Sequence, residues 1–175
     1  MLVKRTDYSC DIDKCLIEWE DIQSRLWDDM WYSSGDGSLQ SCVQRNIKSN
    51  QDPFNDGAGS FRGTDKVELD YNTLNEVYEG TVIAKVIQDL GGVRARVMSK
   101  KRHTTYSVHS DKAPRYHLAL ITNPNAYFIF PTLNEIVHIP ADGFVYEVDT
   151  TIPHSFVNCG EDRMHLVISK RSSSC

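Results

Sequence analysis

The segment that decides the fold of this chain is residues 115–131, with the sequence RYHLALITNPNAYFIFP. Two short runs rich in aliphatic, β-branched and aromatic side chains, near 115–122 and 126–130, are separated by Asn123-Pro124-Asn125. Short apolar runs bounded by Asn and Pro are typical of β-strands, because helices need longer periodic segments. The segment therefore predicts two strands joined by a turn.

The same pattern covers most of the second half of the chain. Further candidate strands lie near 94–99, 104–109, 135–139, 144–149, 152–157 and 163–169. Eight strands in about 75 residues leave no room for the crossovers of a dozen or more residues that parallel strands require. We therefore expect a mainly β fold with N-terminal helices, a double-stranded β-helix of the jelly-roll, cupin-like type.

The first 92 residues show a different pattern. Apolar residues recur at three- and four-residue steps over roughly 11–29 and again over about 72–90, which predicts two helices. Gly80 can break the second helix, and Gly91-Gly92 can end it. The stretch 33–65 is rich in Gly, Ser, Asn and Asp, so we expect a loop long enough to act as a lid.

We expect a single domain over 1–175. Within it, residues 1–92 supply a helical and loop buttress with the lid, and residues 93–170 form the jelly-roll catalytic core.

Composition excludes several classes of partner. The 175 residues carry a formal net charge of -5, and the one notable basic run is Lys100-Lys101-Arg102, so nucleic acid is not an expected partner. No apolar stretch approaches the roughly 20 residues that span a bilayer. The five cysteines are odd in number and form no C-x-x-C pair, which favours reduced thiols. We expect a soluble, intracellular protein of the cytoplasm.

A candidate metal site lies in the β-rich half, which contains all six histidines. In His109-Ser110-Asp111 the imidazole and the carboxylate are two positions apart, so an extended strand points both to one face. His154 follows four or five strands later, where a facing strand is expected. Two imidazoles and one carboxylate on one face of a metal leave three positions open, as in iron(II) oxygenases.

A candidate clamp for a dicarboxylate opens the last predicted strand. Arg163 lies nine residues after His154 and alternates with apolar residues, so Arg163, His165 and Val167 are expected to face the interior of the barrel. The guanidinium of arginine is suited to bidentate binding of a carboxylate. Taken singly, His154 also fits a role at a strand end and Arg163 a surface ion pair.

Three blocks of the sequence resemble the aspartyl/asparaginyl β-hydroxylase family of 2-oxoglutarate oxygenases. The blocks are residues 106–111, 115–123 and 145–167, within a likeness that covers about 80–168. The family segment with the first two iron ligands is similar to the first block. Its distal His and cosubstrate Arg are similar to His154 and Arg163 in the third block.

This resemblance implies a site and a reaction. Fe(II) is expected on His109, Asp111 and His154, and the distal carboxylate of 2-oxoglutarate on Arg163, with supporting contacts from Arg115 and His117. No catalytic residue is expected beyond the metal site. The implied activity is hydroxylation of an amino acid or a peptidyl residue with O₂ as cosubstrate and release of succinate and CO₂. The implied partner is a small-molecule or peptide substrate, not a membrane, and the oligomeric state stays open.

Two other functions fit the same pattern of residues. A cupin-type metalloenzyme would bind a divalent ion without 2-oxoglutarate, and Arg163 would then be dispensable. A non-enzymatic jelly-roll binding module would use its histidines only to satisfy buried polar groups. Arg94 and Arg96 alternate in the first strand of the β region, which would give one face a positive charge directed at an acidic substrate or cosubstrate.

Overall fold

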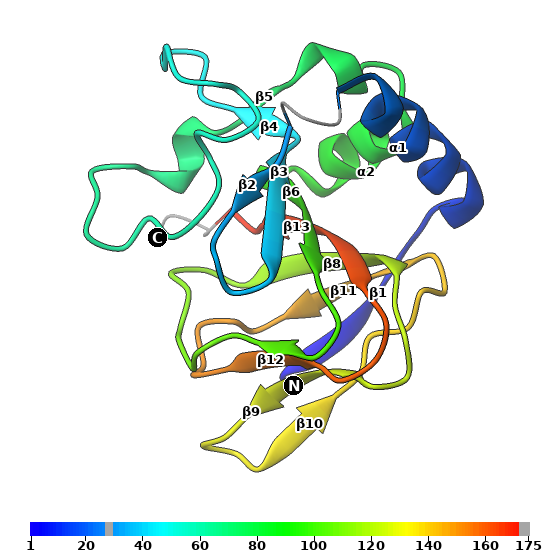
Figure 1. Cartoon of the computed structure of the whole chain (residues 1–175), viewed down its shortest axis with the longest axis vertical. Coiled ribbons are helices and arrows are strands. Elements are labelled where there is room, and N and C mark those ends of the chain that lie inside the picture. The colour runs from blue at the N-terminus through cyan, green and yellow to red at the C-terminus, as the bar shows by residue number, and fades with distance from the viewer. Residues whose placement is uncertain (27–29, 172–175) are drawn as a thin grey trace.

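Two antiparallel sheets form the body of the structure, a computed structural model that describes residues 1–26 and 30–171 (Figure 1). The larger sheet has the order β1-β11-β8-β13-β6-β3-β2, and the smaller one the order β10-β9-β12-β7. The strands of the larger sheet are β1 (Val3–Ser9), β2 (Tyr32–Ser33), β3 (Ser38–Cys42), β6 (Val93–Lys100), β8 (Arg115–Ile121), β11 (Phe144–Val148) and β13 (Arg163–Ser169). Those of the smaller sheet are β7 (Thr104–Thr105), β9 (Ala126–Phe130), β10 (Glu135–Val137) and β12 (Ser155–Asn158).

The remaining elements lie before β6. They are α1 (Ile12–Leu26), α2 (Val82–Leu90), the 3₁₀ turns η1 (Glu68–Asp70) and η2 (Glu76–Tyr78), and the short pair β4 (Gln44–Arg45) and β5 (Thr73–Leu74). No helix among the described residues is long and apolar enough to cross a membrane.

The strands from β6 onward confirm the predicted jelly roll. Along the chain they pass back and forth between the sheets, with β9 and β10 consecutive in one sheet: β6, β8, β11 and β13 belong to the larger sheet, and β7, β9, β10 and β12 to the smaller one. All eight predicted strands are present, although the one expected at 104–109 is reduced to two residues and a single bridge at His109. The two sheets face each other and leave a space between their inner faces for a site.

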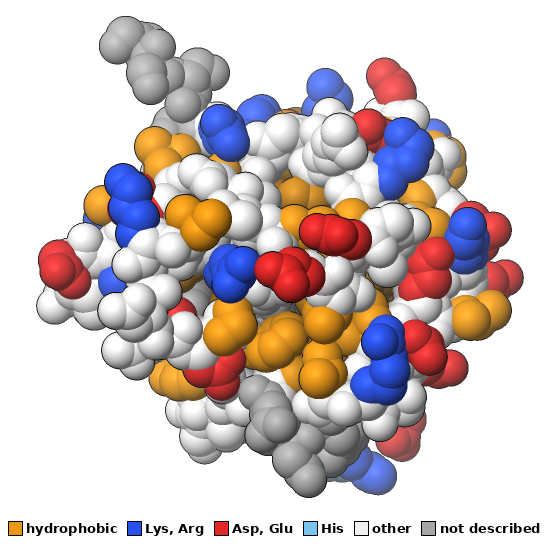
Figure 2. All heavy atoms as spheres, turned by 90° about the horizontal axis from the view of Figure 1, so that it is seen from above, with side chains coloured by type: hydrophobic (Ala, Val, Ile, Leu, Met, Phe, Trp, Pro, Cys, Tyr) orange, Lys and Arg blue, Asp and Glu red, His pale blue; other side chains and the backbone are white. Residues whose placement is uncertain are grey.

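The helices cover the outer face of the larger sheet. Trp19 of α1 and Ile83 of α2 share one buried cluster with Leu118 of β8 and Leu166 of β13. Each such side chain contributes about 1.5–3 kcal/mol when fully buried. Figure 2 shows the side of the molecule on which the helices lie, where acidic and basic side chains are interspersed around a central hydrophobic area.

The second helix is shorter than the sequence predicted. The helix expected over 72–90 begins only at Val82, because Gly80 has a φ of +76° and Thr81 caps the helix by accepting a hydrogen bond from the amide of Ala84 at 3.1 Å. The predicted end is confirmed by Gly91, which has a φ of +62°.

The expected loop at 33–65 is wrong in part, since β3 is a strand of the larger sheet within it. Ser38 and Gln40 hid this strand, because they are polar although both are buried. The first strand, β1, was also missed, since its sequence VKRTDYS has no clear apolar alternation. For the helix predicted over 11–29, residues 27–29 lie outside the described part.

The inner face of the larger sheet is polar and mostly basic. In β13, Leu166 and its outward neighbours pack in the helix-facing cluster, whereas Arg163 and Val167 line a cavity between the sheets, as predicted. The same alternation directs Arg96 of β6 and Arg115 of β8 inward.

Candidate metal centre

Two distant histidines are held side by side by the backbone. His109 and His154 form an isolated antiparallel bridge in which each amide donates to the other's carbonyl, at 2.9 and 2.8 Å. Their ring centroids lie 4.6 Å apart. The amide of Asp111 donates to the carbonyl of Thr150 at 2.8 Å, and this bond holds the carboxylate of Asp111 beside the two imidazoles. The three potential ligand atoms of His109, Asp111 and His154 lie within 4.8 Å of one another.

Both imidazoles are oriented by backbone carbonyls. Nδ1 of His109 donates to the carbonyl of Ser107 at 2.8 Å, and Nδ1 of His154 donates to that of Ile152 at 2.9 Å. These bonds leave the Nε2 lone pair of each ring free for a metal ion. Burial lowers the pKa of His154 although its bond to Ile152 opposes this shift, so the ring is neutral at pH 7, as a ligand must be.

Arg115 holds the carboxylate of the group. Its Nε donates to Oδ2 of Asp111 at 3.1 Å. Burial by itself would raise the pKa of Asp111, but the charge and hydrogen bond of Arg115 outweigh it and lower that pKa far below the usual value. Asp111 is therefore ionised at any physiological pH. The group consists of two imidazoles and one carboxylate, the donor set of a three-ligand iron(II) site.

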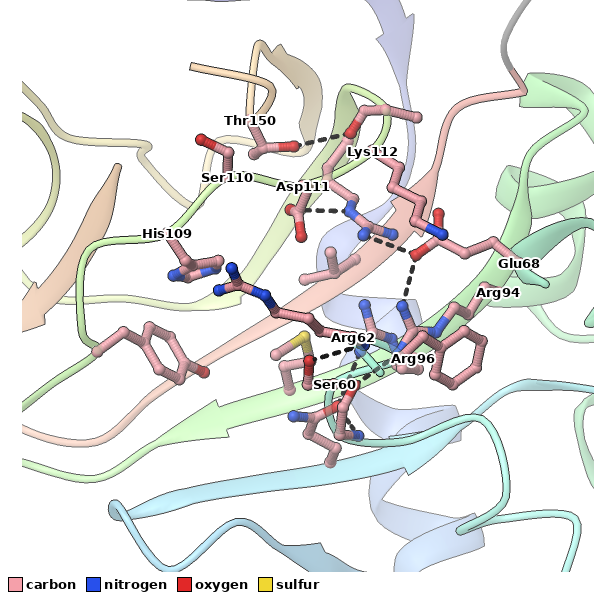
Figure 3. Close-up of a pocket in the computed structure, with 18 of the residues that line it drawn as sticks. Ser60, Arg62, Glu68, Arg94, Arg96, His109, Ser110, Asp111, Lys112 and Thr150 are labelled. Carbon is pink, nitrogen blue, oxygen red and sulfur yellow. Dashed lines mark hydrogen bonds and ion pairs between the residues drawn. The ribbon is translucent and has the colours of Figure 1, made fainter. Parts of the chain in front are cut away.

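The group opens into a cavity of about 1050 Å³ between the sheets. Figure 3 shows His109 and Asp111 on one side of this cavity, with Glu68, Arg94 and Arg96 across from them. The volume lies at the upper end of the roughly 300–1,000 Å³ of small-molecule sites. The cavity therefore has room for more than a five-carbon diacid.

Arg163 is a buried guanidinium with few partners. It is 2% exposed, its Nη1 donates to the carbonyl of Met98 at 3.3 Å, and its Cζ lies 3.9 Å from the centre of the Phe156 ring. Its Nε has no hydrogen-bond partner among the described residues. A buried charge without a counter-ion is costly, so this position favours an anionic ligand.

His117 and His165 form a neutral pair beside Arg163. Their Nδ1 atoms lie 3.5 Å apart, and neither Nε2 has a partner within the described part of the chain. Burial, and after it the charge of Arg163, lowers the pKa of both rings well below the usual value. His117 lines the cavity. His165 received no role from the sequence, yet it is buried in the same wall.

Arg115 makes three contacts with other side chains of the chain. Its donors go to Asp111, to Ser169 and to Glu68, the last at 2.7 Å. Glu68 also accepts a hydrogen bond from Nη1 of Arg94 at 2.5 Å. Because Glu68 belongs to η1, these two ion pairs hold that turn against the cavity. Sequence reasoning missed Glu68, because nothing in a loop sequence indicates which buried arginines it will meet.

Comparison with solved structures identifies the fold. A prolyl-4-hydroxylase from Pseudomonas putida matches with a TM-score of 0.55 and 12% identity, over 98% of this chain and 94% of that one. HygX from Streptomyces hygroscopicus, solved with nickel and 2-oxoglutarate bound, matches with a TM-score of 0.52 and 8% identity, over 95% and 81%. The chain has the jelly-roll fold of 2-oxoglutarate oxygenases.

A third match has the same fold. It is the prolyl hydroxylase from Trichoplax adhaerens in complex with a peptide fragment of the hypoxia inducible factor oxygen degradation domain. The TM-score is 0.56 and the identity 10%, over 96% of this chain and 82% of that one. No family model and no curated protein matches the sequence.

Proposed function

We propose that this protein is an Fe(II)- and 2-oxoglutarate-dependent oxygenase that hydroxylates an amino acid or a peptidyl residue. The observation that carries the proposal is the pairing of two features in one cavity. The first is the group His109, Asp111 and His154, whose donor atoms lie within 4.8 Å of one another. The second is the buried guanidinium of Arg163, whose Nε has no partner among the described residues.

The residues fit both groups. The two imidazoles and the ionised carboxylate would hold Fe(II), with positions left for further ligands. Arg163 would hold the distal carboxylate of 2-oxoglutarate. When bound, Fe(II), 2-oxoglutarate and O₂ supply the oxidising power for hydroxylation, with succinate and CO₂ as co-products. The structure of HygX with nickel and 2-oxoglutarate is support for this pairing on the same fold.

The chain's own residues bind the cosubstrate, orient the metal ligands and exclude water. Arg115 keeps Asp111 ionised and directed at the metal position. His117 stays neutral, lines the cavity and has an Nε2 without a partner among the described residues, and we propose that it supports the cosubstrate. We likewise propose a supporting contact of Arg115 with 2-oxoglutarate, beside its existing bonds to Asp111, Ser169 and Glu68. Phe128 and Phe156 line the same wall with apolar surface, which excludes water from that part of the cavity.

The narrower assignment rests on sequence. We propose the aspartyl/asparaginyl β-hydroxylase-like family because of the three blocks at 106–111, 115–123 and 145–167. A peptide or a small molecule is the proposed substrate, and the Trichoplax adhaerens enzyme with its bound peptide supports the former. We also propose that residues 1–175 act as one catalytic domain in the cytoplasm.

Titration calorimetry with Mn(II) and 2-oxoglutarate tests this function. We expect one Mn(II) per chain and binding of 2-oxoglutarate that requires the metal, because the oxoacid would itself be a ligand of the metal. His154→Ala should abolish binding of both the metal and 2-oxoglutarate. The wild-type ring of His138 bonds the carbonyl of Ala126 and lies outside the cavity, so His138→Ala should change neither binding. Metal binding without 2-oxoglutarate binding would instead support a cupin-type enzyme. Binding of neither would support a non-enzymatic module.

A further inference from the structure

The cavity carries more positive charge than the proposed cofactors need. Eight Lys and Arg side chains and three Asp and Glu side chains line it, in a chain whose formal net charge is -5. Lys66 and Lys170 are paired with acids that do not line the cavity, Asp56 at 2.8 Å and Glu147 at 2.7 Å. At least three positive charges therefore remain. The charges of divalent iron and of dianionic 2-oxoglutarate cancel each other, so their binding leaves this excess of positive charge unchanged.

Arg96 is the least compensated member of the cluster near the metal position. It is 5% exposed, and its one hydrogen bond within the described residues runs from Nη1 to Oε1 of Gln40 at 2.8 Å. Its Nε has no partner there. Burial, and then the charges of Arg94 and Arg115, lower the pKa of Arg96 to about 9. Glu68 neutralises its two neighbours but not Arg96.

Arg96 and Arg163 are separate positions. In the register of β6 with β13, Arg163 faces Lys100, whereas Arg96 faces Val167, four residues further along β13. Four residues of a strand span roughly 13 Å. A 2-oxoglutarate clamped by Arg163 would therefore leave the guanidinium of Arg96 free.

The rim of the cavity extends the charge outward from Arg96. Arg62 belongs to the loop that precedes η1, and Figure 3 shows its side chain reaching into the cavity toward His109. Lys112 follows Asp111 and lines the same mouth. An anionic molecule entering past these two side chains would meet a focused positive potential that leads to Arg96.

We propose that Arg96, with Arg62 and Lys112 at the rim, forms a second anion site that binds a carboxylate or a phosphate of the substrate. The planar fork of a guanidinium matches either group. Only the identification of this anion as part of the substrate rests on the proposed oxygenase function, because the site itself follows from the cavity.

Titration calorimetry on protein loaded with Mn(II) and saturating 2-oxoglutarate tests the site. The probes are inorganic phosphate and N-acetylglycine, with N-acetylglycinamide as the neutral control. We expect one equivalent of an anionic probe to bind and the neutral amide not to bind. The tighter of the two anions identifies the chemical group that the substrate carries.

Variants separate this site from the cosubstrate clamp. Arg96→Gln should weaken anion binding at least tenfold and leave 2-oxoglutarate binding intact, whereas Arg163→Gln should do the reverse. Arg102→Gln, at a side chain that is 59% exposed and does not line the cavity, is the matched control. Because Arg96 is buried, its replacement could disturb the fold, so Arg62→Gln on the exposed loop provides a second test. This variant should weaken anion binding about threefold.

Two results would overturn the proposal. One is anion binding that Arg96→Gln and Arg62→Gln leave unchanged in folded protein. The other is an anion that binds only without 2-oxoglutarate and is lost in Arg163→Gln, because it would then occupy the clamp. If instead 2-oxoglutarate fails to bind while anion binding still depends on Arg96, the oxygenase function fails and the anion site stands.

Discussion

Replacement of Arg163 by glutamine should separate ligand binding from fold stability. Its guanidinium is 2% exposed and has a free Nε, so a bound carboxylate would form a charge-assisted pair in a desolvated position. Loss of one partner from a buried ion pair costs about 3–5 kcal/mol. At 1.4 kcal/mol per factor of ten, Arg163→Gln should weaken 2-oxoglutarate binding by a factor of about 100 to 4,000.

The stability of the metal-free, ligand-free protein should change little. Arg163 has no carboxylate partner among the described residues, so the variant removes a buried charge whose main compensation is Phe156 at 3.9 Å. A cation–π contact of this kind contributes about 2 kcal/mol, and a hydrogen bond from a charged group, as to Met98 here, about 1.5–3 kcal/mol. Together they are comparable with the several kcal/mol that burial of the charge costs. We expect the free energy of unfolding of Arg163→Gln to stay within about 1 kcal/mol of wild type.

Two assays measure the two effects. Urea unfolding without ligands gives the intrinsic stability, and thermal unfolding with Mn(II) and increasing 2-oxoglutarate gives the ligand effect. Wild type at 100 times its dissociation constant should gain about 2.7 kcal/mol, and the variant should gain almost none at that concentration. Equal stabilisation of both proteins by 2-oxoglutarate would refute the reasoning.

Three further predictions concern the site and the strands that carry it. Arg115→Gln should lower Mn(II) affinity about 10–100-fold by calorimetry, because it frees Asp111, and unchanged affinity would contradict this role. In metal-free protein the free energy of unfolding should fall as pH drops below about 6.5, by up to about 1.4 kcal/mol per pH unit for each of His117 and His165. The reason is that these two histidines are protonated in the unfolded chain but stay neutral when buried in the folded protein. Urea unfolding as a function of pH should show a flatter profile in the variant with both histidines replaced by glutamine. Gly92→Ala should destabilise by about 1–3 kcal/mol in the same assay, because its Cβ would lie 2.3 Å from Cγ2 of Ile168; an unchanged midpoint would show that β13 can yield there.

The sequence predicted those features that depend on local pattern. The strands from β6 to β13 follow from short apolar runs and turn residues, and the shared direction of His109 and Asp111 follows from their spacing. The inward direction of Arg163 follows from its alternation with outward apolar neighbours. Each of these rests on residues a few positions apart, where strand geometry is fixed.

The features that were missed depend on contacts between distant residues. In β3 the polar Gln40 faces the basic interior rather than solvent, so the usual rule of apolar residues inside does not reveal the strand. Glu68 acquires its role only when η1 folds over the ends of β6 and β8 and meets two arginines. Long-range charge pairing of this kind leaves no periodic signal in a single sequence.

The most direct test of the account is the visible spectrum of the protein with Fe(II) and 2-oxoglutarate under anaerobic conditions. Chelation of the oxoacid by iron held on His109, Asp111 and His154 should give a weak metal-to-ligand charge-transfer band. The band should be present in wild type, weakened sharply in Arg163→Gln at the same 2-oxoglutarate concentration, and absent in His154→Ala. No band in folded, iron-loaded wild-type protein would contradict the proposed oxygenase.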